Sequence, residues 1–130
     1  MTTWPTNRNP TATGKAWRRD VLGNAYVDAS EAGKNDFNDA YLTLITEAAW
    51  GHVWSRPQWT KRERSLVTIA LLAALGHQEE LALHIRATAN TGATADDIRE
   101  ALLHVAIYSG VPAANTAMKV ARETLEDMAK

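Results

Sequence analysis

The sequence contains no cysteine among its 130 residues. A disulfide framework, a zinc–thiolate site and thiol redox chemistry are therefore all excluded for this chain. The absence of cysteine also agrees with a cytoplasmic location. The sequence further lacks the alternation of apolar and polar residues that is typical of β-strands, and its content of β-branched residues is low. We therefore expect an all-α protein.

An excess of charge of either sign is also absent, since 14 basic residues stand against 15 acidic ones and the formal net charge is −1. A chain of this balance lacks the electrostatic footprint of a nucleic-acid or anionic-membrane partner. No long hydrophobic run is present, because the apolar residues 66–75 are followed at once by Gly76 and His77. The N-terminal residues MTTWPTNRNPTATG do not resemble a signal peptide. We predict a soluble cytoplasmic protein that binds neither nucleic acid nor membrane.

Hydrophobic residues make up 45% of the chain and charged residues 22%, as in an ordinary globular domain. Residues 1–14 are rich in proline, threonine and asparagine, so we expect a flexible leader there, and one helical domain over residues 15–130. Helical periodicity and breaks predict a six-helix bundle. The expected helices cover residues 15–30 with a break near Gly23, 35–53, 60–75, 77–90, 94–109, and the segment that starts near Pro112.

Helix starts and ends are marked by short signals. Thr60 with Glu63, and Thr94 with Asp97, have the spacing of N-terminal capping pairs. Gly76 is expected to end the helix that starts after Thr60. The apolar residues predicted to face the interior are Trp17, Val21, Leu22, Tyr26, Val27, Phe37, Tyr41, Leu44, Ile45, Ala48, Leu66, Ile69, Ala70, Leu72, Ala73, Ile98, Ala101, Leu102, Val105, Tyr108, Met118, Ala121 and Leu125. So many apolar helix faces in a small domain also predict self-association.

The candidate site lies in residues 77–90. His77, Glu80 and His84 follow one another at spacings of three and four residues, so they share one face of a helix among apolar neighbours. Ionisable groups in such surroundings often have shifted pKa values and carry chemistry. A metal site is the weaker interpretation, because three ligands over two turns span about 10 Å. On spacing alone, a buried Glu–His hydrogen bond that only supports the core is favoured.

Three segments in the same order resemble the carboxymuconolactone decarboxylase family. They are ITEAAWGHVWSRP, TKRERSLVTIALLAALGHQEELALHIRATANTGAT and EALLHVAIYSGVPAANTA. The resemblance extends from about Lys15 to the C-terminus. The wider family includes the alkylhydroperoxidase D enzymes, whose C-x-x-C-x-x-x-H helix would place cysteines at His77 and Glu80. The glutamate of those peroxidases would correspond to Ser65. These departures exclude peroxidase chemistry and favour the decarboxylase branch.

The resemblance implies a fold of the alkylhydroperoxidase D type, assembled as a homohexamer. It implies decarboxylation of 4-carboxymuconolactone to 3-oxoadipate enol-lactone in protocatechuate breakdown, without a metal or another cofactor. The substrate is a small molecule with carboxylates, and electrons left by CO2 flow through its ring alkene to the lactone carbonyl. The protein then has to orient the carboxylates, support the enolate oxygen and protonate a ring carbon.

His84 is the expected acid, since an unperturbed histidine pKa of about 6.5 allows proton transfer in both directions near neutrality. Glu80, one turn earlier, could orient the imidazole or raise its pKa. Arg56 and Arg64 are candidate carboxylate holders, because a guanidinium group matches a carboxylate bidentately. Other candidates for the substrate-binding group are Trp50, Ser65 and His104. Arginines on helices are often only solvated, and tryptophans at this spacing are often plain core.

Two other functions stay open. One is a paralogue that acts on another small lactone or keto acid, because related scaffolds host different reactions. The other is a helical binding or assembly protein without catalysis. The presence of Arg56, Glu80 and His84 favours an enzyme over the second alternative.

Overall fold

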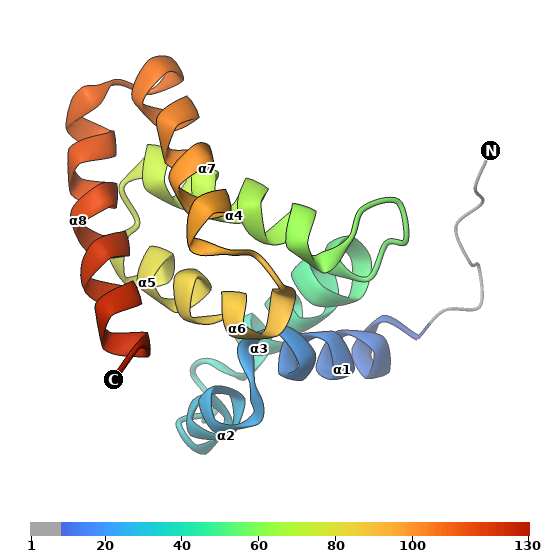
Figure 1. Cartoon of the computed structure of the whole chain (residues 1–130). Helices are drawn as coiled ribbons and strands as arrows, with labels where there is room; N and C mark the ends of the chain where they lie inside the picture. Colours follow the sequence, from blue (N-terminus) through green and yellow to red (C-terminus); the bar gives the residue numbers. More distant parts are fainter. Residues whose placement is uncertain (1–8) are drawn as a thin grey trace. The chain divides into compact units, whose positions relative to one another are not determined.

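A computed structural model describes residues 9–130, and within that range every regular element is a helix, which confirms the all-α prediction (Figure 1). Seven α-helices and one π-helix, η1, are accompanied by the single-turn helix α6. The elements in chain order are α1 (Pro10–Leu22), α2 (Asn24–Ala32), α3 (Asp39–Ile45), η1 (Thr46–Trp54), α4 (Lys61–Leu75), α5 (Gln78–Arg86), α6 (Thr88–Thr91), α7 (Ala95–Tyr108) and α8 (Val111–Met128).

The chain packs as two compact units, Met1–Gln58 and Trp59–Lys130, which we call unit 1 and unit 2. The structure has more helices than the six expected, because three of the expected helices are each divided in two. The break at Gly23 was anticipated. The divisions at Thr46 and Ala87 were not.

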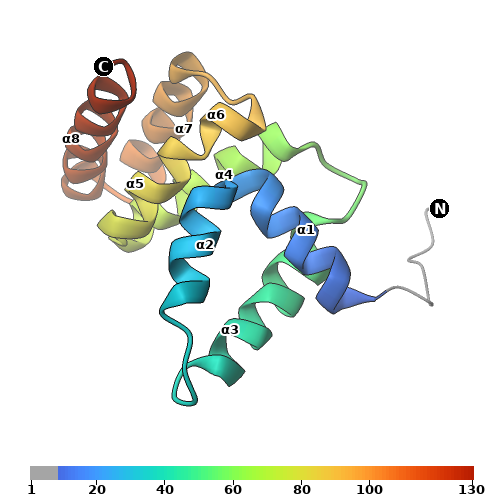
Figure 2. The same ribbon diagram turned by 90° about the horizontal axis from the view of Figure 1, so that it is seen from below.

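Unit 1 begins with a helix that starts earlier than its sequence suggested. The Asn9 side chain accepts a hydrogen bond from the Ala12 amide, and Pro10 occupies the first turn of α1, where its missing N–H is harmless. Residues 10–14 are therefore helical, and the expected leader boundary at residue 14 is wrong. Residues 1–8 of that leader lie outside the described part. Gly23, at a φ of 89°, then sets the change of direction between α1 and α2 that Figure 2 shows.

The expected helix over residues 35–53 is an α-helix only in its first half. From Thr46 to Trp54 the backbone is π-helical, and the two parts follow each other without a turn. π-helical segments are rare and are often found at functional sites. Sequence periodicity at 3.6 residues does not detect them, so the boundary could not be predicted.

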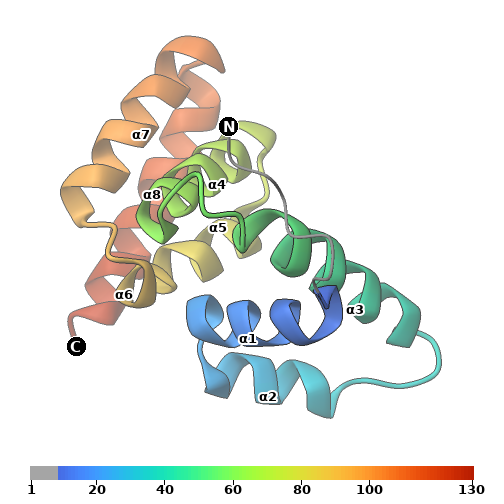
Figure 3. The same ribbon diagram turned by 90° about the vertical axis from the view of Figure 1, so that its right-hand side faces the viewer.

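Two glycines allow α1 and η1 to approach closely, as Figure 3 shows. A Cβ atom on Gly14 would clash with the carbonyl group of Thr46, whose carbon would lie only 2.9 Å away. A Cβ atom on Gly51 would clash with the carbonyl oxygen of Pro10. Neither glycine has a positive φ. Both are therefore needed for space rather than for backbone conformation.

The predicted buried stripe on α3 is wrong. Phe37, Tyr41 and Leu44 are 96%, 62% and 63% exposed, Ala48 is also exposed, and α3 contains no buried residue. The predictions for Val21 and Val27 are confirmed, whereas Tyr26 is 43% exposed. Val21 and Val27 are buried, as are Trp50 and Trp54 of η1, whose ring centres are 4.9 Å apart. The apolar side chains of α3 are not fully covered by other residues within 9–130.

Unit 2 follows the sequence signals closely. Both predicted capping boxes are present, at Thr60 with Glu63 and at Thr94 with Asp97. Gly76 ends α4 in the left-handed conformation, as expected for a helix C-terminus. The helix expected over 77–90 stops at Arg86, and the short α6 follows.

The core of unit 2 lies between α4, α5, α7 and α8. In Figure 1, α7 and α8 run side by side after the sharp connection at Gly110. The residues that form this core are Ile69, Ala73, Leu81, Ile85, Ile98, Leu102, Val105, Ala114, Ala117 and Ala121. Two of the residues predicted to point inward do not, since Tyr108 is 85% exposed and Met118 is 44% exposed. Within residues 9–130, no helix has the length and apolar character needed to cross a membrane.

Candidate active site

His84 lies in the last turn of α5, between the fully buried Leu81 and Ile85. Burial lowers the pKa of its imidazole from 6.5 to about 4, and the nearby Glu80 carboxylate only partly opposes this effect. The imidazole is therefore neutral at pH 7 in the free protein. The unperturbed pKa assumed from the sequence does not hold in this environment.

Glu80 is exposed on α5, one turn before His84, and acts on the imidazole through its charge. The expected effect of Glu80 on the pKa thus has the predicted direction, but desolvation is larger. His77 does not share the helical face, because it precedes α5 as its N-cap residue with non-helical backbone angles. The expected row of three titratable groups is reduced to two.

Arg64 and Ser65 are neighbours near the start of α4. The Arg64 guanidinium lies 5.9 Å from the centre of the Trp59 ring, within range of a cation–π interaction. Ser65 is completely buried, and its hydroxyl has no hydrogen-bond partner among residues 9–130. A buried hydroxyl without a partner is uncommon and marks a position where a further polar group could bind.

α4 and α5 contact each other and are joined through Gly76 and His77. Arg64 and Ser65 lie in the half of α4 that is remote from this connection, and His84 lies in the remote half of α5 (Figure 1). These three residues thus lie on two contacting helices, each in the half away from the connection. They comprise a largely buried neutral imidazole, a fully buried hydroxyl and a guanidinium group.

His104 lies on α7. Its exposed ring stacks on that of Tyr108, with the ring centres 6.3 Å apart and the planes inclined by 10°. The remaining candidates, Trp50 and Arg56, belong to unit 1. Trp50 is buried against Trp54, and Arg56 is exposed in the turn after η1. No group of three His, Asp or Glu side chains within the described residues is arranged to hold a metal ion.

Sequence reasoning missed one buried charged residue, Arg18 in unit 1, which is 4% exposed. A signal was present, because Arg18 precedes the buried Val21 by three residues and so lies on the same face of α1. An arginine is rarely placed on the inner face of a helix unless it has partners there.

Comparison with known proteins supports the resemblance seen in the sequence. The model of the carboxymuconolactone decarboxylase family matches residues 39–123, from the start of α3 into α8. The chain belongs to this family. A 4-carboxymuconolactone decarboxylase of Acinetobacter baylyi is 47% identical over 111 residues, which cover 85% of this chain and 83% of that protein. A nitrosuccinic acid decarboxylase of Metarhizium robertsii is 43% identical over 111 residues, 85% of this chain and 78% of that protein.

Both relatives are named decarboxylases, so family membership agrees with an enzyme of the carboxy-lyase class. The two names also differ in substrate, although both substrates carry more than one carboxylate. The two named relatives thus share the type of bond that is broken, but not the molecule that carries it.

Proposed function

We propose that this chain decarboxylates 4-carboxymuconolactone to 3-oxoadipate enol-lactone. The observation that carries the proposal is the 47% identity to a protein of that activity over 85% of the chain. Fully buried Ser65 on α4 and largely buried His84 on α5 supply polar groups among apolar neighbours, as expected for a small-molecule site.

In the proposed reaction the bond between the ring carbon and the carboxylate breaks, and CO2 leaves without the bonding electron pair. That pair shifts through the ring alkene onto the lactone carbonyl oxygen. A proton added to the ring carbon next to this carbonyl then gives the enol-lactone. The electron sink belongs to the substrate, so we propose that the chain uses no cofactor and supplies binding, a hydrogen-bond donor and a proton.

His84 is the proposed proton donor, with Glu80 as a positioning residue. In the free protein the pKa of His84 is near 4, so the imidazole first has to take up a proton. A bound substrate with two carboxylates raises the pKa of a nearby imidazole, because opposite charge favours the protonated form. The substrate thus charges the acid that later protonates it, and the His84 imidazole stays neutral when the site is empty.

Arg64 is the proposed holder of one substrate carboxylate, and Ser65 a donor beside it. Their common position near the start of α4 supports this assignment. Arg56, Trp50 and His104 remain proposed substrate-binding residues, on the chemistry of their side chains and their places in the sequence. Arg56 and His104 are both exposed at the surface.

A second candidate substrate is nitrosuccinate, favoured by the 43% identity to a nitrosuccinic acid decarboxylase. Loss of CO2 from the carbon that bears a nitro group leaves electrons that the nitro group accepts. The same protein groups could therefore serve both reactions, because each substrate is a small dicarboxylate with its own electron sink. A side-by-side rate comparison separates the two candidates.

We further propose a homohexamer of the alkylhydroperoxidase D type, in the cytoplasm. The large exposed apolar side chains support assembly, since monomeric proteins seldom leave so many uncovered. These include Phe37, Tyr41, Leu44, Leu71, Leu75, Leu103, Ile107, Tyr108 and Val111.

The test is the rate of CO2 release from freshly prepared 4-carboxymuconolactone and from nitrosuccinate, for the wild type, His84→Gln and His52→Gln. His52 is an exposed histidine of unit 1 and serves as the matched control. We expect turnover of the lactone by the wild type and by His52→Gln. Loss of a general acid should slow His84→Gln by about 10²- to 10⁴-fold.

Normal turnover by a folded His84→Gln variant would remove His84 as the acid. Faster release from nitrosuccinate would reassign the substrate within the same reaction class. No release from either compound, and no rise in melting temperature with dicarboxylates, would favour a non-catalytic binding protein.

A further inference from the structure

Unit 1 contains a cavity of about 270 Å³ that no proposed catalytic residue lines. This volume lies just below the range of roughly 300–1,000 Å³ that is usual for ligand sites, so it suits a small molecule. The cavity is formed between α1, α2, the segment after α2, and the junction of α3 with η1. The residues that line it are Thr11, Lys15, Arg18, Arg19, Val27, Glu31, Lys34, Leu42, Thr43 and Thr46.

The lining carries a clear excess of positive charge. Four basic side chains line the cavity against one carboxylate, that of Glu31, which leaves a formal excess of three. The chain as a whole has a net charge of −1, so this concentration is local. Basic side chains gathered around one hollow raise the local concentration of anions there.

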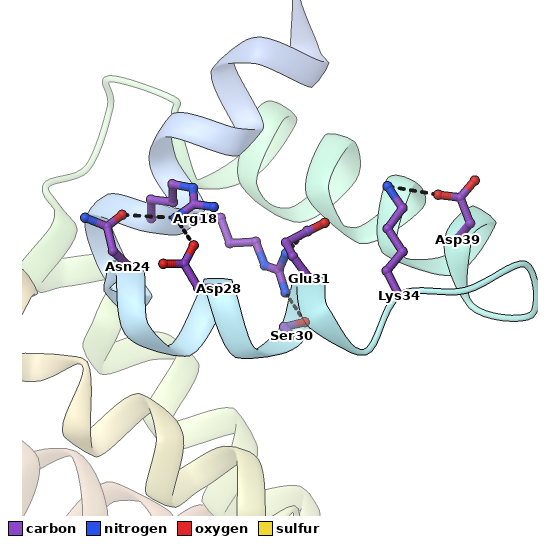
Figure 4. A network of polar contacts seen from close by, with 8 residues as sticks. Arg18, Asn24, Asp28, Ser30, Glu31, Lys34 and Asp39 are labelled. Atoms are coloured by element: carbon purple, nitrogen blue, oxygen red, sulfur yellow. Dashed lines mark hydrogen bonds and ion pairs between the residues drawn. The ribbon is translucent and has the colours of Figure 1, made fainter.

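Existing ion pairs offset only part of this charge. Arg19 binds Asp28 at 2.8 Å, and Lys34 binds Asp39 at 3.0 Å, with both carboxylates well exposed to solvent. Figure 4 shows Lys34 reaching Asp39 across the start of α3. Exposed pairs of this kind are weak and exchange readily with a competing anion. Lys15 forms no ion pair within residues 9–130 and remains available.

Arg18 gives the cavity a fixed, buried cation. Its two terminal nitrogens donate to Glu31 at 3.1 Å and to Ser30 at 2.9 Å, as Figure 4 shows. Its Nε is also buried and has no hydrogen-bond partner among the described residues. A buried donor without a partner is uncommon, and a bound water or anion is one way to satisfy it.

The π-helical segment supports the same conclusion. Thr46, the first residue of η1, lines the cavity, and its carbonyl group is held against Gly14 of α1. π-helical turns cost stability and are frequently retained where a ligand binds. The close α1–η1 contact therefore fixes one wall of the cavity.

We propose that this cavity binds a small organic dianion with two carboxylates. Its cations come from two segments, with Lys15 and Arg19 on α1 and Lys34 after α2, so a ligand with two separated charges can contact both. The buried Arg18 favours carboxylates held between these segments. The proposal does not rest on the decarboxylase function, because no residue assigned to catalysis lines the cavity.

The experiment measures binding of succinate and glutarate to the full chain by calorimetry, at constant ionic strength. Acetate and inorganic phosphate are the comparison anions. The variants are Lys15→Gln and Lys34→Gln, with Lys119→Gln as the control that removes one exposed positive charge from unit 2. His84→Ala distinguishes this site from the proposed catalytic one.

We expect a dicarboxylate to bind the wild type, Lys119→Gln and His84→Ala with equal affinity. Lys15→Gln and Lys34→Gln should each weaken binding about tenfold, the loss typical of a charge-assisted contact. The proposal is overturned if neither dicarboxylate binds, if the unit 1 variants bind as well as Lys119→Gln, or if His84→Ala abolishes binding. Tighter binding of acetate or phosphate would overturn the requirement for two separated carboxylates. If the protein releases CO2 but binds no dicarboxylate in unit 1, only the proposal of this binding site is overturned. If it binds a dicarboxylate in unit 1 but releases no CO2, only the proposed decarboxylase function is overturned.

Discussion

His84 illustrates how the same residue has one chemistry in the sequence and another in the fold. A histidine with ordinary exposure is half-charged near pH 6.5. In α5 its imidazole lies between buried Leu81 and Ile85, and desolvation moves the pKa to about 4. The exposed carboxylate of Glu80 is too well solvated to reverse this shift. An empty site therefore holds a neutral imidazole, and a bound dianion is needed to charge it.

This shift has a consequence for the pH dependence of stability. Below about pH 6.5 the unfolded chain protonates His84, while the folded chain keeps it neutral until about pH 4. The folded pKa is depressed, so stability is lost as the pH falls through this window. At roughly 1.4 kcal/mol per pKa unit, the loss approaches about 3 kcal/mol at pH 4.

We expect His84→Gln to lack this contribution, so that the stability advantage of the wild type over the variant shrinks by up to about 3 kcal/mol between pH 7 and pH 4. Urea unfolding at a series of pH values measures it. His52→Gln should follow the wild type within about 0.5 kcal/mol throughout, as expected of an exposed position. If the free energies of unfolding of the wild type and His84→Gln changed with pH in parallel, the depressed pKa of His84 would be contradicted.

At the scale of elements, the close contact of α1 with η1 depends on two glycines, which have no side chain to keep the helices apart. The backbone of α1 at Pro10 meets Gly51, and the backbone of η1 at Thr46 meets Gly14. Helices that approach this closely leave no room for a methyl group, and relief requires a shift of main chain rather than of a flexible side chain.

Gly51→Ala should therefore destabilise the protein by about 1–3 kcal/mol or more, through overpacking. Gly33→Ala is the matched control, because the nearest atom to its added Cβ would be the Ser30 carbonyl oxygen at 3.5 Å, an ordinary contact. That variant should stay within about 0.5 kcal/mol of the wild type. Chemical unfolding of both variants measures the difference, and equal stability of the two would refute the steric argument.

At the scale of the whole molecule, apolar side chains are divided between a covered interior and an uncovered surface. Ile107 and Tyr108 at the end of α7 are 78% and 85% exposed, and Phe37 before α3 is 96% exposed. Helical periodicity in the sequence predicts that Phe37 and Tyr108 face inward, because it does not distinguish a covered apolar face from an exposed one. A subunit of an oligomer has two kinds of apolar face, and both have helical spacing.

If copies of the chain cover these faces, Ile107→Lys should dissociate the assembly by placing a charge in an apolar contact. Glu100→Gln, on the same helix and exposed, changes the net charge by the same amount and should leave the assembly intact. Light scattering coupled to size-exclusion chromatography gives the mass relative to the 14.3 kDa subunit. A monomeric wild type would contradict the proposed oligomer.

The sequence by itself determined the helical class, the caps at Thr60 and Thr94, the end of α4 at Gly76, and the family. These depend on local interactions, such as a side chain bonding a backbone amide three residues on, and on residue patterns that need no knowledge of packing. It also located His84 and Glu80 on one helix. The site could be predicted this far because spacing along a helix is a local property.

Only the tertiary structure decided which apolar faces are buried, where helices break, and what the charges experience. Phe37 and Val21 are equally apolar in the sequence, and only the packing of neighbouring elements separates them. The depressed pKa of His84 requires knowledge of what surrounds it, as does the basic cavity around Arg18. Burial and electrostatic environment are sums over residues distant in sequence, and local patterns do not contain them.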